Sequence, residues 1–387
     1  MRYTAFAFVV ASLTVAQAAQ QPKLPPPFHT PSANNPPRVV PKPQGAKVNV
    51  PAGFRVDIWA EGFERPRFMA EGPGGEILLS DSTRKGKVWV LTNDGKNRRE
   101  LLGGLDRPYG IAFWKDYVYV AETTSVKRYK YDAKARTVGP GAEVVSLKDH
   151  GQGHWTRNIL FDPDGAKMYL AVGSQSNVSP GEPEIRAAIS RYNPDGSGHE
   201  LWATGTRNPI GMRWYPGTKD LWAAVQERDA LGDDLVPDYL TQIHQGAFYG
   251  WPYGYVGKVE DPRNKGKRPD LVAKMANWDV LLPAHAAVLD FIFYTGKQFP
   301  KEYQGGAFLA YHGSWNRAKR LGYSVAFVPF KDGKPAGEPK EFLTGFMLGP
   351  DEKEVWGRPV GLLQLPDGSV LLSEDGGNRI WRISYGK

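Results

Sequence analysis

One unit recurs six times between Gly53 and the C-terminus. Each copy contains an apolar strand, a turn with glycine, and a second apolar strand that ends in small or polar residues. The copies begin at Arg65, Arg107, Arg157, Arg207, His285 and Arg358. The first four starting points lie roughly 40 to 50 residues apart, the length of one four-stranded propeller blade, and the longer intervals after them predict insertions. We therefore predict that residues 52–387 form one all-β domain, a six-bladed β-propeller.

The turn sequences and the strands at the two ends of the domain also agree with a propeller. Asp-Gly turns within residues 162–165, 193–196 and 365–368 favour antiparallel hairpins inside the units. The segment Gly53–Trp59 is predicted to pair with Arg379–Ser384, because such pairing closes the ring of blades and leaves no sheet edge open.

The N-terminus predicts export. Residues 1–19 have a short basic start, an apolar run too short to span a bilayer, and a small-residue cleavage site at Ala16-Gln17-Ala18. We read them as a signal peptide of a periplasmic protein with no stable membrane insertion. Residues 20–51 hold ten of the 32 prolines and are predicted to form an extended arm without a fold of its own.

The amino-acid composition excludes several kinds of reactive site and binding partner. The chain has no Cys, which excludes disulfides, thiolate metal sites, Cys nucleophiles and a covalently attached c-type haem. Any redox reaction must therefore use a cofactor that needs no thiol. The formal net charge is +8. In an exported protein this charge favours an anionic small ligand or an acidic redox partner, with no nucleic acid as partner.

The first position of the unit carries chemical information. Five of the six copies start with Arg and the remaining one starts with His285. Equivalent positions of a propeller lie at equal distances from its axis, so these side chains are expected to converge at the mouth of the central channel. Five guanidiniums repel one another unless an anion lies between them, and a polycarboxylate suits their geometry best. The alternative is that each Arg pairs with a carboxylate of the neighbouring blade.

A histidine lies beside this ring. His154 stands three residues before an anchor arginine in Gly151-Gln-Gly-His154-Trp-Thr-Arg157, so the loop should place its imidazole at the channel mouth. There it could act as a general base near neutral pH. A lone histidine is more often structural, and that default is kept for the remaining five: His29, His150, His199, His244 and His312.

An acidic loop follows the fourth unit. Residues 227–234 contain one Glu and three Asp around Gly232. Such a loop is either a calcium site with oxygen ligands, without EF-hand spacing, or a solvated acidic loop. The residues alone do not choose between the two.

Taken in order along the blades, the motifs resemble those of the soluble quinoprotein sugar dehydrogenases, six-bladed propellers that use pyrroloquinoline quinone (PQQ). The motifs are Gly151–Arg157, Gly205-x-Arg-Asn-Pro-x-Gly211, Glu227 with Asp233-Asp234, and Tyr249-Gly-Trp-Pro252. Three further segments resemble the L-sorbosone dehydrogenase branch more than soluble glucose dehydrogenase: Leu282–Ala287, Tyr311–Arg317 and Gly322-Tyr323. The resemblance covers the whole propeller.

The resemblance implies roles for the ring residues. His154 resembles the base that removes the proton of the sugar's anomeric hydroxyl while hydride passes to the quinone. Arg207 would stabilise charge at the reacting carbonyl, and Asn208 would contact the cofactor. Three further arginines would bind it: Arg358 clamps carboxylates, Arg317 replaces a clamp Lys, and Arg107 stands near a family Gln. Arg157 joins the cofactor-binding set as a member of the ring.

The resemblance also implies calcium. The backbone carbonyls of Asp229 and Ala230 would ligate a cofactor-bridging Ca²⁺, where relatives usually carry Gly-Pro. Asp234 and the Tyr249 carbonyl resemble ligands of a second, structural calcium. Leu235 stands where the related enzyme has an acidic residue.

The function that follows is PQQ-dependent oxidation of an aldose or a sorbosone-like sugar aldehyde. Electrons would pass to an external acceptor such as a periplasmic cytochrome. Two alternatives remain open: a calcium-dependent lactonase, which needs a cluster of Glu, Asn and Asp at the channel mouth, and a non-catalytic propeller that binds a glycan or a partner.

Overall fold

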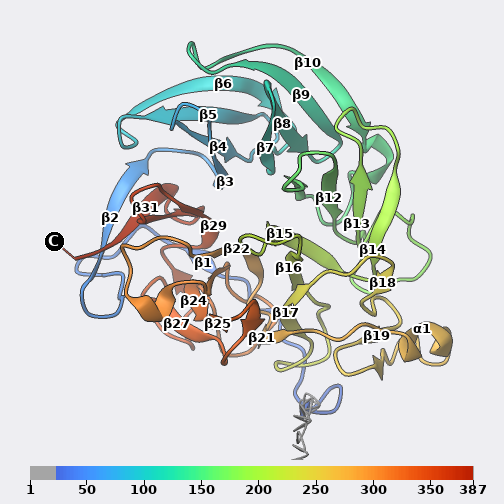
Figure 1. The fold of residues 1–387 in the computed structure, drawn as a ribbon. Helices are drawn as coiled ribbons and strands as arrows, with labels where there is room; N and C mark the ends of the chain where they lie inside the picture. The colour runs from blue at the N-terminus through green and yellow to red at the C-terminus, as the bar shows by residue number, and fades with distance from the viewer. Residues whose placement is uncertain (1–22, 387) are drawn as a thin grey trace, which may run out of the picture.

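Six antiparallel sheets of four or five strands surround a common centre (Figure 1). The structure is a computed structural model and describes residues 23–386. The predicted six-bladed β-propeller is confirmed. The signal peptide predicted for residues 1–19 lies outside the described residues. Within residues 23–386, no helix has the length and apolar character required to cross a membrane.

The first three blades follow one another along the chain. Blade 1 consists of β3 (Pro66–Glu71), β4 (Ile77–Asp81), β5 (Gly86–Thr92) and β6 (Asn97–Leu105). Blade 2 consists of β7 (Ile111–Trp114), β8 (Tyr117–Glu122), β9 (Ser125–Asp132) and β10 (Thr137–Ser146). Blade 3 consists of β11 (Arg157–Phe161), β12 (Met168–Val172), β13 (Ala188–Tyr192), β14 (Glu200–Thr204) and the added parallel strand β18 (Ala247–Phe248).

The other three blades complete the ring. Blade 4 consists of β15 (Asn208–Trp214), β16 (Leu221–Gln226), β17 (Pro237–Gln242) and β21 (Val280–Ala284). Blade 5 consists of β22 (Val288–Phe293), β23 (Ala307–Tyr311), β24 (Ser324–Val328) and β27 (Lys340–Leu343). Blade 6 consists of β29 (Pro359–Gln364), β30 (Val370–Glu374), β31 (Arg379–Tyr385) and β2 (Phe54–Glu61).

The ring closes by the predicted pairing of the two ends of the propeller. The strand β2 lies antiparallel to β31, in a register that runs from Phe54 opposite Tyr385 to Glu61 opposite Arg379. The N-terminal strand is thus the outer strand of the last blade, and this pairing fixes blade 6 to the start of the chain.

The two long intervals hold the insertions. Between β17 and β21 the chain forms β18, the hairpin of β19 (Gly254–Tyr255) and β20 (Val259–Glu260), and the short helix α1 (Pro269–Ala273). Around blades 5 and 6 it forms the hairpin of β25 (Phe330–Lys331) and β26 (Lys334–Pro335), and the short strand β28 (Glu354–Val355). Two short 3-10 turns lie at Lys148–His150 and Lys301–Tyr303.

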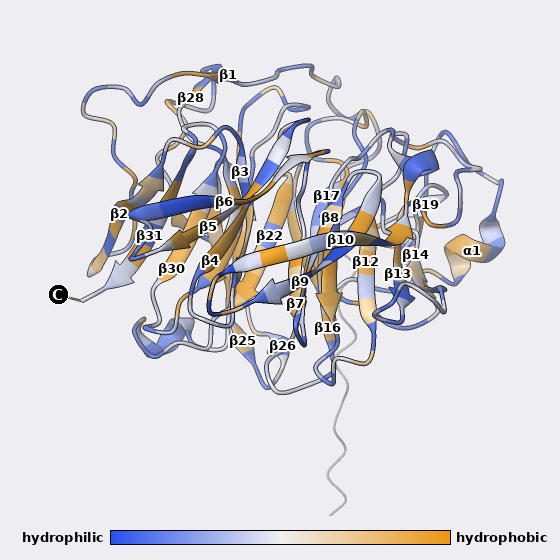
Figure 2. Ribbon diagram, turned by 90° about the horizontal axis from the view of Figure 1, so that it is seen from above, coloured by the Kyte–Doolittle hydropathy of each residue, from blue (hydrophilic) through white to orange (hydrophobic). Residues whose placement is uncertain are grey.

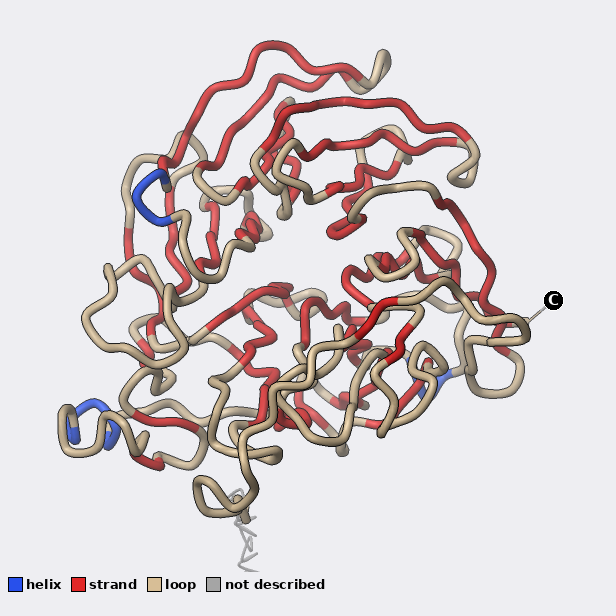
Figure 3. The backbone as a smooth tube through the Cα atoms, turned by 180° about the vertical axis from the view of Figure 1, so that it is seen from behind, coloured by secondary structure: helices blue, strands red, loops and turns tan. Residues whose placement is uncertain are grey.

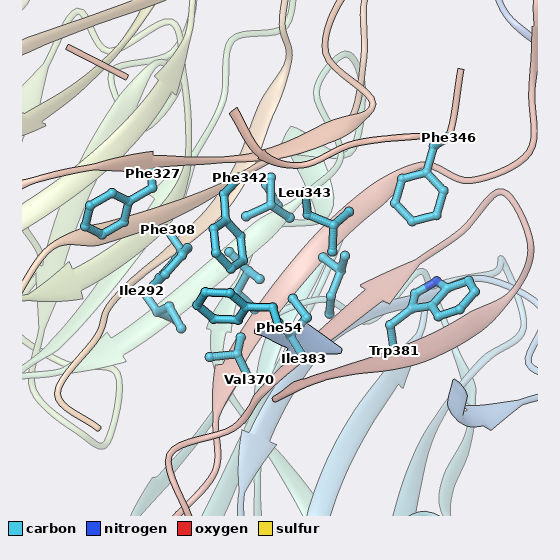
Figure 4. Close-up of a cluster of buried hydrophobic side chains, with 14 of the residues drawn as sticks. Phe54, Ile292, Phe308, Phe327, Phe342, Leu343, Phe346, Val370, Trp381 and Ile383 are labelled. Carbon is cyan, nitrogen blue, oxygen red and sulfur yellow. The ribbon is translucent and has the colours of Figure 1, made fainter. Parts of the chain in front are cut away.

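Apolar side chains pack between neighbouring blades. In Figure 2 the strands in the middle of the molecule are largely hydrophobic, whereas the connections at both ends are largely hydrophilic. The cluster between blades 5 and 6 is the most aromatic, with Phe54, Phe308, Phe342, Phe346 and Trp381 buried together (Figure 4). Burial of such rings between sheets is the dominant favourable contribution to holding the blades together.

Glycines in the repeat allow the innermost strands of neighbouring blades to approach one another closely. In three copies a glycine follows the anchor arginine by three or four residues: Gly110, Gly211 and Gly361. A Cβ at Gly211 would lie 3.0 Å from the Cα of Asp290 on β22, and one at Gly361 would lie 2.4 Å from the carbonyl oxygen of Arg67. Only a residue without Cβ allows this approach, so the blades converge closely around the axis.

The proline-rich arm lies against the propeller. Its short strand β1 (Arg38–Val39) runs parallel to β28, and Asn49 pairs with Thr344. In Figure 3 the tube that leaves the grey trace crosses the blades on the face turned to the viewer. The ten prolines of residues 20–51 predict an extended arm without a fold of its own. The sequence gives no signal for β1, which is only two residues long and pairs with a distant strand.

Candidate active site

His154 lies in the loop between the turn at Lys148–His150 and β11. Its Nδ1 is 2.8 Å from the carbonyl oxygen of Ser174. A carbonyl only accepts, so Nδ1 carries the proton and donates, and Nε2 keeps its lone pair. Burial, and then the charge of Arg207, lowers the pKa of His154 to about 3. The ring is therefore neutral at physiological pH and presents one nitrogen that can accept a proton.

Asn208 lies beside this imidazole. A Cβ at Gly173 would lie 2.1 Å from Asn208 Oδ1 and 2.8 Å from the Cβ of His154, so the glycine lets the two side chains approach. The Asn208 amide donates to Gln226 Oε1 over 2.9 Å, while its own Oδ1 is buried without a hydrogen-bond partner. A buried amide oxygen left in this way costs free energy unless a ligand or water satisfies it.

Arg207 is largely engaged by the protein. Its guanidinium donates to the carbonyl oxygens of Asn177 and Glu227 over 3.1 and 2.6 Å. It also donates to Asn177 Oδ1 over 3.0 Å and to Asp229 Oδ2 over 3.2 Å. A guanidinium has five N–H groups, so little donor capacity remains for a ligand. Its charge is nevertheless fixed close to His154.

His285 occupies the place that arginine takes in the other five copies. Its Nδ1 is 3.2 Å from Asp229 Oδ1 and its Nε2 is 2.9 Å from the Gly232 carbonyl oxygen. Burial opposes the charged ring, but the hydrogen bonds to Asp229 and Gly232 outweigh it and raise the pKa of His285. Burial likewise opposes the charge of Asp229, yet His285 and Arg207 hold the pKa of that carboxyl below its usual value.

A second group joins blades 1, 5 and 6 around Asp375. Asp375 Oδ1 is 2.8 Å from His312 Nε2, and Oδ2 pairs with Arg67 and lies 3.6 Å from Arg65 Nε. His312 Nδ1 is in turn 3.0 Å from Arg358 Nη2. One buried carboxylate thus organises three guanidiniums, one of them through the imidazole. Of the predicted ring, Arg65 shows the pairing with a neighbouring blade that was the alternative to an anion site.

Arg157 holds the loop of the candidate base. It is fully buried, and its guanidinium donates to the carbonyl oxygens of His154 and Thr156 over 2.7 and 2.9 Å and to that of His150 over 2.6 Å. These bonds run along the segment that carries the imidazole. The side chain therefore positions His154, and its Nε is buried without a hydrogen-bond partner.

Trp155, the residue after the candidate base, lies between two cations. The guanidiniums of Arg67 and Arg107 are 5.3 and 5.5 Å from its ring centroid. Arg107 also contacts Asp106, with Nε 3.3 Å from Oδ1. Such cation contacts keep like charges close together around one indole, so Arg107 belongs to the same charged region as Arg67.

The remaining predicted residues lie apart from His154 or pair with each other. Arg317, predicted to bind cofactor, is 2.9 Å from Asp234, predicted to bind metal, and also donates to the Asp233 carbonyl oxygen. Tyr249 is buried and its hydroxyl donates to the Gln242 carbonyl oxygen over 2.8 Å. Among residues 23–386, no hydrogen bond joins Tyr249 to Asp234.

The arginines fit an anionic cofactor such as PQQ. Burial lowers the pKa of Arg65, Arg157 and Arg358, and in each case neighbouring guanidiniums lower it further. Arg67, Arg157 and Arg358 each keep a buried Nε–H without an acceptor. Crowded cations with unused donors are stabilised by a polycarboxylate, and the candidate base stands next to them.

The oxygens that the resemblance assigns to calcium are partly engaged by the protein itself. The Asp229 carbonyl already accepts from Asn177 Nδ2 over 3.0 Å, and the Asp229 carboxylate is shared by Arg207 and His285. Among residues 23–386 no three His, Asp or Glu side chains gather as a metal site. Calcium also binds backbone carbonyl oxygens, and within the described part of the chain no hydrogen bond reaches the carbonyl oxygen of Ala230, so this oxygen could still ligate an ion.

Most of the chain matches the model of one protein family. The TrAA12-like family model matches residues 48–246 and 269–386. The chain belongs to the TrAA12-like family. This TrAA12-like protein is also 30% identical over 364 residues to an uncharacterised protein of Borreliella burgdorferi, covering 88% of the chain and 91% of the relative. An uncharacterised protein of Synechocystis is 25% identical over 308 residues, or 64% of the chain and 71% of the relative.

Solved structures share the fold of the TrAA12-like protein. The calcium structure of the Trichoderma reesei carbohydrate-active enzyme of family AA12 has a TM-score of 0.75 at 20% identity, covering 88% of this chain and 97% of that one. The holo PQQ domain of pyranose dehydrogenase from Coprinopsis cinerea also has a TM-score of 0.75 at 20% identity, covering 89% and 98%. Aldose sugar dehydrogenase from Escherichia coli has 0.64 at 17%, covering 86% and 99%.

Four residues of the site lie outside the sequence prediction: Arg67, Asn177, His312 and Asp375. Arg67 stands two residues after an anchor arginine and Asp375 closes the last repeat, so both could have been found from the repeat alignment. Asn177 lies in a loop after β12 and has no repeat signal. His312 was assigned the structural default, although it contacts Arg358 directly.

Proposed function

We propose that this TrAA12-like protein is an exported PQQ-dependent dehydrogenase that oxidises an aldose or a sorbosone-like sugar aldehyde. One observation carries the proposal: a neutral His154 with its Nε2 free stands beside a group of crowded arginines with unused donors. A base next to an anion site is what hydroxyl oxidation by an anionic quinone requires. The fold shared with PQQ-dependent sugar dehydrogenases supports the choice of cofactor.

When bound, the quinone would supply the acceptor of two electrons and a proton. The arginines Arg67 and Arg358 would hold its carboxylates, with Asn208 at its edge. His154 Nε2 would take the proton of the substrate hydroxyl, while the hydrogen bond to Ser174 keeps the ring in the required tautomer. Anionic carboxylates near Arg207 would offset the positive charge that lowers the pKa of His154, and so make the base stronger once the site is filled.

The proposal extends to compartment and electron acceptor. The predicted signal peptide supports a periplasmic location. The net charge of +8 supports an acidic external acceptor such as a periplasmic cytochrome. Electrostatic steering predicts that reduction of a purified acidic cytochrome slows as salt is raised, and a rate independent of salt would contradict it.

Reconstitution tests the proposed function. The chain is mixed with PQQ, with and without calcium, and binding is followed by quenching of tryptophan fluorescence and by the quinone absorbance. Reduction of an artificial dye is then measured with a panel of aldoses and sugar aldehydes. We expect saturable binding and turnover with part of the panel. Failure of both binding and turnover across the panel would overturn the proposal.

A further inference from the structure

The loop Asp229–Asp234 is hydrogen-bonded by other parts of the chain along its whole length. At its start, Asp229 N donates to Asn177 Oδ1 over 2.9 Å, and the Asp229 carbonyl accepts from Asn177 Nδ2 over 3.0 Å. One amide side chain thus binds both backbone groups of Asp229, as a strand partner would. Together with Arg207 and His285 on the carboxylate, every polar group of this residue is engaged.

The proline-rich arm holds the outer half of the loop. Phe28 N donates to the Leu231 carbonyl oxygen over 2.8 Å, and Asp233 N donates to Thr30 Oγ1 over 2.7 Å. Between these bonds, a Cβ at Gly232 would lie 2.9 Å from the Thr30 carbonyl oxygen. The arm and the loop are therefore in direct backbone contact, and Gly232 permits it with a φ of +110°.

Asn316 connects the arm to the inner half of the loop. Its Oδ1 accepts from Ala230 N over 2.8 Å, and its Nδ2 donates to the Ala33 carbonyl oxygen. The side chain is itself buried. Next to it, Asn35 N donates to the Trp315 carbonyl oxygen over 2.8 Å and Asn35 Oδ1 accepts from Arg320 over 2.8 Å. A single amide therefore joins the arm, the blade 5 loop and the loop that borders Arg207.

The arm is anchored beyond these contacts. The pairing of β1 with β28 and the bridge between Asn49 and Thr344 fix it on the blade 5 and blade 6 side. A segment tied down in this way loses less conformational entropy when its earlier residues bind the loop. The hydrogen bonds from the anchored arm therefore favour one conformation of the loop.

We propose that arm residues 28–35 and Asn316 form a protein brace that holds the loop Asp229–Asp234 beside Arg207, so that the loop keeps its shape whether or not calcium is bound. Asn316 Oδ1 and Thr30 Oγ1 accept from the backbone N–H groups of Ala230 and Asp233, and Phe28 N donates to the Leu231 carbonyl oxygen, so the brace fixes the direction of the loop backbone. Its bearing on quinone binding rests on the proposed function. The shape of the loop does not, and it can be measured without any cofactor.

Amide hydrogen exchange of the full chain tests the brace. Exchange of the peptide that spans residues 229–234 is compared in excess calcium chloride and in excess chelator. We expect equal protection of this peptide in both conditions. Faster exchange of this peptide in chelator would overturn the proposal.

Variants separate the two halves of the brace. In Asn316→Ala the amides of both Ala230 and the arm should exchange at least tenfold faster, while the rest of the propeller stays protected. Asn316→Asp retains an acceptor for Ala230 N but loses the donor to Ala33, so exchange should rise in residues 30–36 only. Thr30→Val removes the acceptor of Asp233 N, so the amide of Asp233 should exchange faster. Matched controls are Asn193→Ala and Thr218→Val, whose side chains make similar bonds in turns at the opposite ends of blades 3 and 4.

The outcomes distinguish the brace from the proposed function. If exchange behaves as expected and PQQ still does not bind, the brace stands and the proposed function fails. If PQQ binds only with calcium and the loop peptide is protected only with calcium, the function stands and the brace fails. Unchanged exchange in both Asn316 variants would also overturn the brace.

Discussion

His312 and Asp375 form a hydrogen bond between blades 5 and 6, with Nε2 2.8 Å from Oδ1. Since Nδ1 of the same ring faces the Arg358 guanidinium over 3.0 Å, the imidazole accepts from Arg358 and donates to Asp375. Burial, and then the charge of Arg358, lowers the pKa of His312 to about 3, so the ring is neutral. The pair therefore fixes the direction of a guanidinium that, in the proposed function, holds a carboxylate of the quinone.

Replacing His312 should weaken quinone binding. In His312→Gln the side chain can still donate to Asp375 but no longer accepts from Arg358. Hydrogen bonds to charged groups contribute about 1.5 to 3 kcal/mol, so we expect the Kd for PQQ to rise about tenfold to a hundredfold. Fluorescence titration measures it, with His199→Gln as an exposed control away from the site. An unaltered Kd would show that Arg358 needs no such support.

Replacing His154 should separate turnover from binding. In His154→Gln the side chain keeps a polar group near Ser174 but cannot take up a proton. General base catalysis contributes about a hundredfold to ten-thousandfold, so we expect kcat to fall by that factor while the Kd for PQQ stays within about twofold. Steady-state dye reduction and quinone titration are the measurements. A variant with the wild-type kcat would remove His154 from the mechanism.

The neutral state of His312 predicts a pH dependence of stability. The unfolded ring binds a proton below pH 6.5, whereas the folded ring does so only near pH 3. Between these values the unfolded chain holds more protons, so His312 makes a contribution that is complete above pH 6.5 and is lost as pH falls toward 3. Urea unfolding should show that the stability advantage of the wild type over His312→Gln shrinks in this window. Other titrating groups, including Asp375 and Glu374, are present in both proteins. A constant difference would contradict a neutral ring.

The fold could be predicted because its signal is periodic. The repeat starting at Arg65 and ending with Asp375 gives the number of blades, and the apolar strands at both ends of the domain predict the closure between β2 and β31. The contacts of the proline-rich arm have no such periodic signal. The arm's contacts with residues 231–233 and 315–320 are individual backbone and side-chain hydrogen bonds between distant segments, and such bonds leave no periodic pattern in the sequence.

The sequence predicted where the arginines of the site gather, but it did not predict which groups each arginine contacts. The repeat indicates that arginines gather at the starts of the inner strands. The repeat does not indicate that Arg157 donates to carbonyl oxygens of the His154 loop, or that Arg317 pairs with Asp234. Which acceptor a guanidinium selects depends on the loops that surround it, and the lengths and directions of those loops are set by tertiary packing.

Gly173 should be intolerant of a side chain. Its position allows His154 and Asn208 to approach, and a Cβ there would lie 2.1 Å from Asn208 Oδ1. In Gly173→Ala the two side chains must move away from the new Cβ, so we expect turnover to fall at least tenfold and the melting temperature to fall as well. Gly139→Ala is the matched control, because nothing lies within 4 Å of its Cβ position. If Gly173→Ala retains wild-type turnover, the juxtaposition of His154 and Asn208 does not matter for activity.

Closure of the ring should depend on Phe54. Its ring is buried on β2 and makes edge contacts with Phe299 and Phe342, with centroids 4.8 and 4.9 Å apart. Phe54→Ala leaves a cavity between blades 5 and 6 and should lower the free energy of unfolding by about 3 to 5 kcal/mol. Ile58 on the same strand is 46% exposed, so Ile58→Ala should cost less than about 1 kcal/mol. Both are measured by urea unfolding. Equal effects of the two substitutions would mean that β2 is held by its backbone pairing with β31 and owes little to the aromatic cluster.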